Sequence, residues 1–307
     1  MEKYDLIIIG GSAAATAAGI YAVRRNLNFK IISKDFGGEV ATSGEVDNYP
    51  GIPDTDGLTL AEKFKKHLAD YGVEPETGIE VEKINKLGDG TFSVTAKDGK
   101  EYIAKAVIIA TGVHPRELNV PGEKEFRNKG VSYCTVCDGP LFPRKTVAII
   151  GGGNSALEAG IMMADIASRV YMINKNSFFK GDQILIDNLS KKKNVEIIYN
   201  AMTTEIVGDG FVSGLKYKDQ SGNEKELQVE GIFIHIGMIP NSGIALEGIE
   251  KTKAGEIVVS KNCETNVPGL FAAGDVTDIP FKQIVIAAGQ GTCALLQAVN
   301  YLNRLKQ

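Results

Sequence analysis

The feature that most constrains the fold is an internal repeat of one strand–turn–helix–strand pattern. The first copy, residues 4–34, has an apolar strand, a turn that opens at Gly10, an alanine-rich helix and a second apolar strand. The second copy, residues 145–175, has the same order, and its turn opens at Gly151, 141 residues after Gly10. Two such βαβ units predict two nucleotide-binding domains of the same general design.

A second repeated pattern follows each βαβ unit: a hairpin of strands with alternating polarity, and then a short buried strand. The expected strands are residues 6–9, 29–32, 91–95, 102–104 and 106–110, and then 147–150, 170–173, 212–217, 225–229 and 232–236. A closing helix is expected over residues 281–305. The predicted fold is α/β, with two Rossmann-like dinucleotide-binding domains of the three-layer ββα type, the second inserted into the first. The predicted domains are 1–114 with 244–307, and 115–243, with hinges at 111–114 and 240–243.

Composition narrows the function classes. The net charge of −4 argues against a dedicated nucleic-acid or membrane-surface binder. The uncharged stretch 6–23 is too weakly apolar at its Gly-Gly-Ser turn for a membrane span, and the first residues lack a signal peptide's positive region. A cytoplasmic protein without a membrane span is therefore expected. Glycine makes up 35 of the 307 residues, about 11% against a usual 7%, which predicts many sharp turns and close backbone approaches.

The two glycine turns differ in how well they match a dinucleotide fingerprint, whose glycines let the backbone approach a pyrophosphate at a helix N-terminus. Gly151, Gly153 and Ala156 fit the pattern, whereas the first turn has Ser12 and Ala15 at the later positions. The acidic residue that usually binds ribose about 20 residues further on is absent from both copies. Residues 33–35 (Ser-Lys-Asp) and 174–176 (Asn-Lys-Asn) stand there instead.

Cys134 and Cys137 form the sharpest chemical motif, a C-x-x-C pair followed by Asp138. Such a pair brings two thiols within disulfide reach inside one turn, and one thiol often has a lowered pKa and attacks other disulfides. Asp138 could move the proton that thiolate formation requires. A zinc site would need a second pair. Cys263 and Cys293 are isolated, 30 residues apart, and the histidines are scattered, so redox chemistry is favoured and no metal is expected.

These pieces together define a reaction class. A dithiol pair exchanges two electrons and a nicotinamide donates a hydride, so a mediator is needed. Two dinucleotide sites provide it if one binds a flavin and the other a nicotinamide. The residues alone therefore predict a flavin-dependent disulfide oxidoreductase.

Nearly the whole chain resembles the low-molecular-weight thioredoxin reductases of bacteria and archaea, within the FAD-dependent pyridine nucleotide-disulfide oxidoreductases. The family's C-A-T-C-D-G resembles residues 134–139, its G-G-G-N-[TS]-A-x-E residues 151–158, and its E-[VI]-x-N-[WY]-P-G residues 45–51. Its A-T-G resembles residues 110–112, and its closing G-x-F-A-A-G-D-V-x-D and Q-x-x-x-A-x-G-x-G resemble residues 269–278 and 283–291.

The resemblance implies a homodimeric thioredoxin reductase with FAD, in which Cys137 lies next to the flavin, Cys134 attacks the disulfide of thioredoxin, and Asp138 donates a proton. The implied FAD residues are Gly10, Gly11, Ser12, Ala13, Ser33, Gly38, Glu39, Asn48, Ala110, Thr111, Gly112, Gly274, Asp275, Lys282, Gln283 and Ile284. The implied NADPH or NADH residues are Gly151, Gly153, Asn154, Ser155, Glu158, Lys175 and Lys180. The inserted domain that carries the C-x-x-C pair would rotate on the two hinges so that the pair alternates between flavin and solvent.

Two departures leave the donor and the partner open. Where the family binds the NADPH 2′-phosphate with H-R-R-x-x-x-R, this chain has Asn-Lys-Asn at 174–176 and Lys180, without the arginine fork. NADPH, NADH or a different donor is therefore expected. Residues 140–142 (Pro-Leu-Phe) replace the aromatics that shape the thioredoxin surface, so a thioredoxin-like or glutaredoxin-like partner is also open. The alternatives are a flavin-dependent dithiol oxidase and a redox-sensing module without donor binding.

Overall fold

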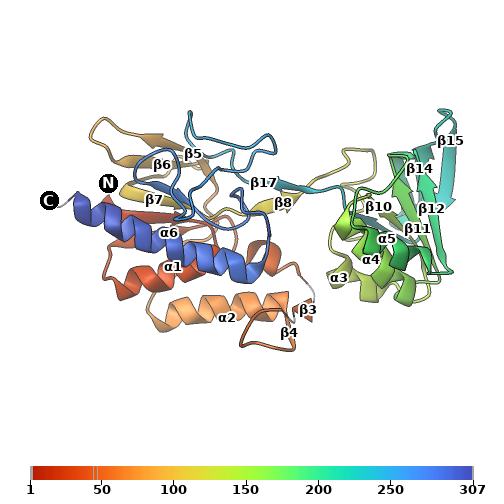
Figure 1. Cartoon of the computed structure of the whole chain (residues 1–307), viewed down its shortest axis with the longest axis horizontal. Helices are drawn as coiled ribbons and strands as arrows, with labels where there is room; N and C mark the ends of the chain where they lie inside the picture. Colours follow the sequence, from red (N-terminus) through yellow and green to blue (C-terminus); the bar gives the residue numbers. More distant parts are fainter. Residues whose placement is uncertain (1–2, 44, 47, 306–307) are drawn as a thin grey trace. The chain divides into compact units, whose positions relative to one another are not determined.

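The computed structural model describes residues 3–43, 45–46 and 48–305 and divides into two compact units. Unit 1 comprises Met1–His114 and Ile239–Gln307, and unit 2 is the intervening segment, Pro115–Met238. Unit 2 thus ends at Met238 rather than at residue 243. The chain leaves and re-enters unit 1 through strands β8 (Val113–Pro115) and β17 (Met238–Pro240), which pair with each other (Figure 1).

Unit 1 is built on a sheet with the strand order β2-β1-β7-β6-β5, in which β18 also pairs with β7. Strands β2, β1, β7 and β18 are parallel, whereas β6 and β5 are antiparallel. The strands are β1 (Lys3–Ile9), β2 (Phe29–Ile32), β3 (Glu45–Val46), β4 (Thr55–Asp56), β5 (Val81–Lys86), β6 (Phe92–Ala96), β7 (Glu101–Ile109) and β18 (Leu270–Ala272). The helices are α1 (Ala13–Arg24), η1 (Gly38–Val40), α2 (Gly57–Asp70) and α6 (Ile284–Arg304).

The core of unit 1 lies on both faces of this sheet. Side chains alternate along a strand, so Leu6 and Ile8 of β1 pack with α1 and α6, while Ile7 and Ile9 pack with the residues of β5 and β6. Burial on both faces explains the unbroken apolar run of β1. Helices α1 and α6 approach closely at Gly291, where an added Cβ would lie 2.0 Å from the Ala14 carbonyl oxygen.

Unit 2 has three layers. A parallel sheet with the order β12-β11-β10-β16-β9 lies between helices and an antiparallel sheet with the order β13-β14-β15. The strands are β9 (Val131–Ser132), β10 (Thr146–Ile150), β11 (Arg169–Asn174), β12 (Val195–Tyr199), β13 (Met202–Asp209), β14 (Phe211–Lys218), β15 (Glu224–Gln228) and β16 (Gly231–Ile234). The helices are α3 (Thr135–Asp138), η2 (Gly139–Leu141), α4 (Asn154–Ile166) and α5 (Gln183–Ser190). Along β10, Val147 and Ile149 face the helices, and Ala148 and Ile150 face the second sheet.

The structure changes several sequence-based boundaries. The strands expected at 102–104 and 106–110 are one strand, β7, which ends at Ile109 and pairs without a break with β1 on one side and with β6 on the other. The closing helix starts at Ile284 instead of residue 281, with Gln283 as its N-cap. Helix α2 was not predicted, although Asp56 caps it by accepting a hydrogen bond from the Thr59 N–H at 2.8 Å. None of the helices in the described part of the chain has the length and hydrophobicity that a bilayer crossing requires.

Candidate active site

The first glycine turn, between β1 and α1, lets three strand ends meet. Gly10 has a φ of +142°, and a Cβ there would lie 2.1 Å from the Ala110 carbonyl oxygen at the end of β7. A Cβ at Gly11 would lie 2.3 Å from the Asp35 carbonyl oxygen, just beyond β2. Any side chain at these two positions would therefore separate the strand ends.

Polar groups at this turn lack partners among the residues that the structure describes. The N-cap of α1, Ser12, makes no side-chain cap hydrogen bond, and the first turn of the helix has no acidic residue, so its first N–H groups remain for an anion. The buried Ser33 hydroxyl, at the end of β2, has no hydrogen-bond partner among the described residues. A Cβ at Gly11 would lie 2.8 Å from this hydroxyl oxygen. A helix N-terminus beside a buried, unpartnered hydroxyl fits the diphosphate and ribose of a dinucleotide.

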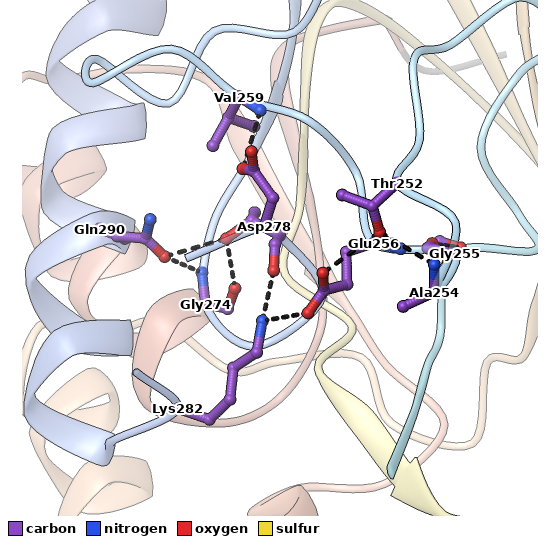
Figure 2. Close-up of polar contacts among 11 residues, drawn as sticks. Thr252, Ala254, Gly255, Glu256, Val259, Gly274, Asp278, Lys282 and Gln290 are labelled. Carbon is purple, nitrogen blue, oxygen red and sulfur yellow. Dashed lines mark hydrogen bonds and ion pairs between the residues drawn. The ribbon is translucent and has the colours of Figure 1, made fainter. Parts of the chain in front are cut away.

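The start of α6 is tied to the loop after β18. The Gln290 side-chain oxygen accepts hydrogen bonds from the Gly274 N–H at 2.8 Å and from the Thr277 hydroxyl at 3.3 Å (Figure 2). Burial raises the pKa of the Asp275 carboxyl, and the nearby Lys282 opposes that rise. Lys282 forms an ion pair with Glu256 at 2.8 Å.

Most of the residues expected to bind FAD lie at one edge of the unit 1 sheet. The carboxyl ends of β1, β2, β7 and β18 meet there because these strands are parallel neighbours. The residues that follow these four strand ends are Gly10, Gly11, Ser12, Ala13, Ser33, Ala110, Thr111, Gly112, Gly274 and Asp275. Gly38 and Glu39 lie in η1, and a Cβ at Gly38 would lie 3.6 Å from the Ser12 Cβ. The Asn48 amide donates a hydrogen bond to the Gln283 side-chain oxygen at 3.2 Å, directly before Ile284.

Asn241 was predicted only as part of the hinge 240–243, yet it holds the Thr111–Gly112 segment in place. Its side-chain amide donates to the Thr111 carbonyl oxygen, and its backbone carbonyl oxygen accepts from the Thr111 hydroxyl, each at 2.8 Å. The Asn241 N–H donates to the Gly112 carbonyl oxygen at 2.9 Å. No sequence pattern links residues that are 130 positions apart.

The second glycine turn, between β10 and α4, has the same backbone form. Gly151 has a φ of +152°, and a Cβ there would lie 2.1 Å from the His235 carbonyl oxygen. Gly153 is the N-cap of α4, and a Cβ there would meet nothing within 4 Å. This part of the turn is open.

Unlike the first turn, the second one is bonded to its own chain. The Lys180 N–H donates to the Gly152 carbonyl oxygen at 2.7 Å. The Asn154 side chain accepts from the Asp182 N–H at 2.7 Å and donates to the Asp182 carboxylate at 3.0 Å. Asn174, at the position of the usual ribose-binding acid, is buried and donates to the Phe178 carbonyl oxygen at 2.8 Å. The other residues expected here, Ser155, Glu158, Lys175 and Lys180, are exposed.

The C-x-x-C segment is held by its backbone. The Cys134 N–H donates to the Ser132 hydroxyl at 3.0 Å, and the Asp138 N–H donates to the Cys134 carbonyl oxygen at 3.1 Å. Cys134 is disulfide-bonded. Cys137 lies in α3, and its side chain is outside the described part of the structure. Asp138 is the last residue of α3 and is half-buried.

His235 and Glu123 support this segment and were missed by sequence reasoning. The Nε2 atom of His235 lies 2.6 Å from the hydroxyl of Thr135, which is buried between the two cysteines. Burial lowers the pKa of His235 to about 4, so the ring is neutral near pH 7. Glu123 is fully buried and accepts a hydrogen bond from the hydroxyl of Tyr133 at 2.8 Å. His235 is 100 residues from Thr135; only the fold brings them together.

Comparisons with known proteins agree with this geometry. Residues 4–291 match the family described as pyridine nucleotide-disulphide oxidoreductase. An alkyl hydroperoxide reductase subunit of Escherichia coli (strain K12) is 42% identical over 99% of this chain, which spans only 59% of that relative. The thioredoxin reductase of Lactococcus lactis superposes with a TM-score of 0.82 at 32% identity, covering 98% of this chain and 99% of that one. The thioredoxin reductase of T. acidophilum superposes with a TM-score of 0.80 at 39% identity, covering 99% of this chain and all of that one.

These matches confirm the predicted α/β fold and the predicted resemblance. The cofactors that they imply are FAD and NAD(P)H, and the unpartnered groups at the first glycine turn fit a dinucleotide of this kind. The chain belongs to the pyridine nucleotide-disulphide oxidoreductase family and has the thioredoxin reductase fold.

Proposed function

We propose that this chain passes electrons from NADPH or NADH, through FAD in unit 1, to a Cys134–Cys137 disulfide and then to the disulfide of a thioredoxin-like protein. The observation that carries the proposal is the C-x-x-C pair in α3, with its backbone held by Ser132 and its central Thr135 by a neutral His235. Thioredoxin reductases of L. lactis and T. acidophilum share the fold over their whole length, which supports a partner of the thioredoxin type.

The residues of unit 1 would bind and orient the flavin. When bound, FAD supplies the two-electron chemistry that connects a hydride donor with a dithiol. The first N–H groups of α1 would hold its diphosphate, and the Ser33 hydroxyl would gain the partner that it lacks among the described residues. The N-terminus of α6, which begins after Gln283, would favour the negative charge of a reduced ring system.

The dithiol would reduce its partner by thiol–disulfide exchange. The Cys134 thiolate attacks one sulfur of the partner disulfide, so that a mixed disulfide forms and the partner S–S bond breaks. Cys137 then attacks Cys134, which restores the C-x-x-C disulfide and releases the second partner thiol. Asp138 would transfer the protons that the partner thiolates take up. Thr135 and His235 would act as positioning residues, because burial keeps the His235 ring neutral and its Nε2 atom is engaged by the Thr135 hydroxyl.

A second candidate concerns the partner. The relatives at 42% identity are named as subunits of alkyl hydroperoxide reductases, and this chain spans about 59% of their length. The electron acceptor could therefore be a hydroperoxide-reducing protein, or a module that such relatives carry beyond the shared region. The proposal also includes a cytoplasmic homodimer that binds neither nucleic acid nor membrane.

Cys134→Ser tests the proposal. We expect this variant to retain FAD and to lose disulfide reductase activity by more than about a thousandfold, because the attacking sulfur is gone. Cys293→Ser, outside the proposed site, is the matched control. Each protein should be assayed with NADPH and NADH separately and with a thioredoxin as acceptor. A Cys134→Ser protein that still reduces the acceptor would refute the proposal. Steady peroxide production from a small dithiol, without response to nicotinamide, would support the dithiol oxidase instead.

A further inference from the structure

Cys263 and Cys293 are brought together by the fold, so their description as isolated cysteines is wrong. Cys263 lies in the loop between β17 and β18, is 2% exposed and has a φ of +62°. Its Sγ–H donates to the Gln290 carbonyl oxygen of α6 at 3.5 Å. Cys293, one turn further along α6, reaches back, and its Sγ–H donates to the Lys261 carbonyl oxygen at 3.8 Å. Each thiol thus contacts the backbone segment that carries the other.

The two thiols share one cavity and are both reduced. The cavity has a volume of about 370 Å³, and its lining includes Lys261, Cys263, Asp278, Gln290 and Cys293. Both cysteines are free thiols, the first buried and the second partly exposed. Burial, and then the Cys293 thiol within hydrogen-bonding reach, raises the pKa of Cys263 to about 12. Cys293 is therefore the thiol that a small oxidant in the cavity meets first.

The segments that carry the two thiols are joined by other contacts as well. The Gln297 amide of α6 donates to the Glu264 carboxylate at 2.9 Å, one residue after Cys263. Gln290, which accepts from Cys263 through its backbone, accepts from the Gly274 N–H through its side chain (Figure 2). A bond between the thiols would therefore close a contact that already exists rather than require two distant segments to move.

We propose that Cys263 and Cys293 are a second redox-active dithiol, which hydrogen peroxide entering this cavity oxidises to a disulfide. The Cys293 sulfur attacks the peroxide, an S–O bond forms, the O–O bond breaks, and one water leaves. The Cys263 sulfur then displaces the hydroxyl group from Cys293, forming the S–S bond and releasing a second water. Two thiols lose two electrons and two protons, and one peroxide becomes two waters. The inference does not depend on the function proposed for the C-x-x-C pair.

Peptide mapping of the FAD-loaded full chain tests this inference. Trypsin cleaves after Lys261, Lys282 and Arg304, so Cys263 and Cys293 fall on separate peptides, 262–282 and 283–304. Cys134 and Cys137 fall together on the peptide 130–144, so the two pairs are distinguished. The protein is treated with hydrogen peroxide, alkylated in denaturant, digested and analysed by mass spectrometry. We expect the linked pair 262–282/283–304 to rise from under a tenth to more than half of the protein, and dithiothreitol to reverse it.

Two variants exclude a link made by other cysteines. Cys134→Ser/Cys137→Ser should form the 263–293 link as the unchanged protein does. In Cys293→Ser, Cys263 should stay alkylatable after peroxide, because the first thiol to react is missing. Full alkylation of both cysteines after peroxide, or Cys293 oxidised to sulfinic acid without a link, would overturn the proposal. The mapping of the unchanged protein decides this even if the variants fold poorly.

Discussion

The two glycine turns have one backbone form and two different sets of neighbours. Gly10 and Gly151 both have positive φ values. At each position, an added Cβ would lie 2.1 Å from a backbone carbonyl oxygen. At the first turn, however, the Ser33 hydroxyl has no partner among the described residues. At the second turn, Asn154 is bonded twice to Asp182, and Asn174 is bonded to its own loop.

This difference teaches that the fingerprint and the ligand site are separable. The glycines are required by the close approach of strand ends, and they would be needed even without a ligand. What distinguishes a site prepared for a dinucleotide is the presence of buried polar groups that the protein leaves unsatisfied. On this basis we expect unit 1 to bind its cofactor tightly, and unit 2 to give up contacts of its own when it binds one.

The largest expected effect is the difference between an alanine at a crowded glycine, Gly10, and an alanine at an open one, Gly153. Gly10→Ala places a Cβ 2.1 Å from the Ala110 carbonyl oxygen at a φ of +142°, so it should cost several kcal/mol, about 3 or more, and release FAD. Gly153→Ala meets nothing within 4 Å and should cost about 1 kcal/mol or less. Urea unfolding and flavin absorbance of the purified variants measure both. Equal losses in the two variants would contradict the comparison.

The next effect is a loss of stability in unit 2 as the pH falls. The folded pKa of His235, about 4, lies below its ordinary value of 6.5, so the unfolded chain binds more protons between these pH values. The contribution of the neutral His235 ring to the free energy of unfolding is therefore fully present above pH 6.5. It is lost as the pH drops towards 4, by up to about 3 kcal/mol. The raised pKa of Asp275 acts in the opposite direction in unit 1. Hydrogen exchange at pH 7 and pH 5 should show faster opening of unit 2 only, and His235→Gln should weaken this change.

A smaller effect tests the unsatisfied hydroxyl. Ser33→Ala should weaken FAD binding about five- to tenfold, since one hydrogen bond contributes about 1 kcal/mol. Stability without FAD should hardly change, because the hydroxyl has no hydrogen-bond partner in the described part of the chain. Ser221→Ala, in the exposed turn between β14 and β15, is the matched control. The measurement is the dissociation constant of FAD by fluorescence titration. Unchanged affinity would remove Ser33 from the site.

The smallest effect concerns the second glycine turn, whose Asn154 side chain is hydrogen-bonded to Asp182. Asp182→Ala removes a carboxylate near the N-terminus of α4 and, with it, one of the two hydrogen bonds of the Asn154 side chain; the backbone N–H of residue 182 still forms the other. The first turn of that helix then attracts a phosphate more strongly, and NAD(P)H should bind about two- to fivefold more tightly. Asp209→Ala, at the exposed end of β13, is the control. Weaker binding in Asp182→Ala would mean that the loop helps the donor to bind rather than competing with it.

The sequence predicted what depends on local pattern. Strand β2 has the predicted bounds, residues 29–32, and both glycine turns lie where the repeat puts them. Contacts between distant segments were not predictable. The packing of strands and helices brings His235 to Thr135 and Cys263 to Cys293. Sequence periodicity does not predict such pairs. The hydrogen bonds of the Asn154 and Asn174 side chains to Asp182 and Phe178 were likewise not predictable, because the sequence does not show which partner a side chain takes.

The central claim is that the C-x-x-C pair exchanges electrons with the flavin. The most direct test measures the number of electron pairs that the protein takes up per FAD. The FAD-loaded Cys293→Ser protein, in which the second thiol pair cannot contribute, is titrated anaerobically with dithionite while flavin absorbance is followed. If Cys134 and Cys137 form a redox disulfide that exchanges electrons with the flavin, full reduction should take about two electron pairs per FAD. Adding Cys134→Ser should lower this to about one pair. An unchanged count in the two proteins would contradict the account, because the flavin would then be reduced without any contribution from the C-x-x-C pair.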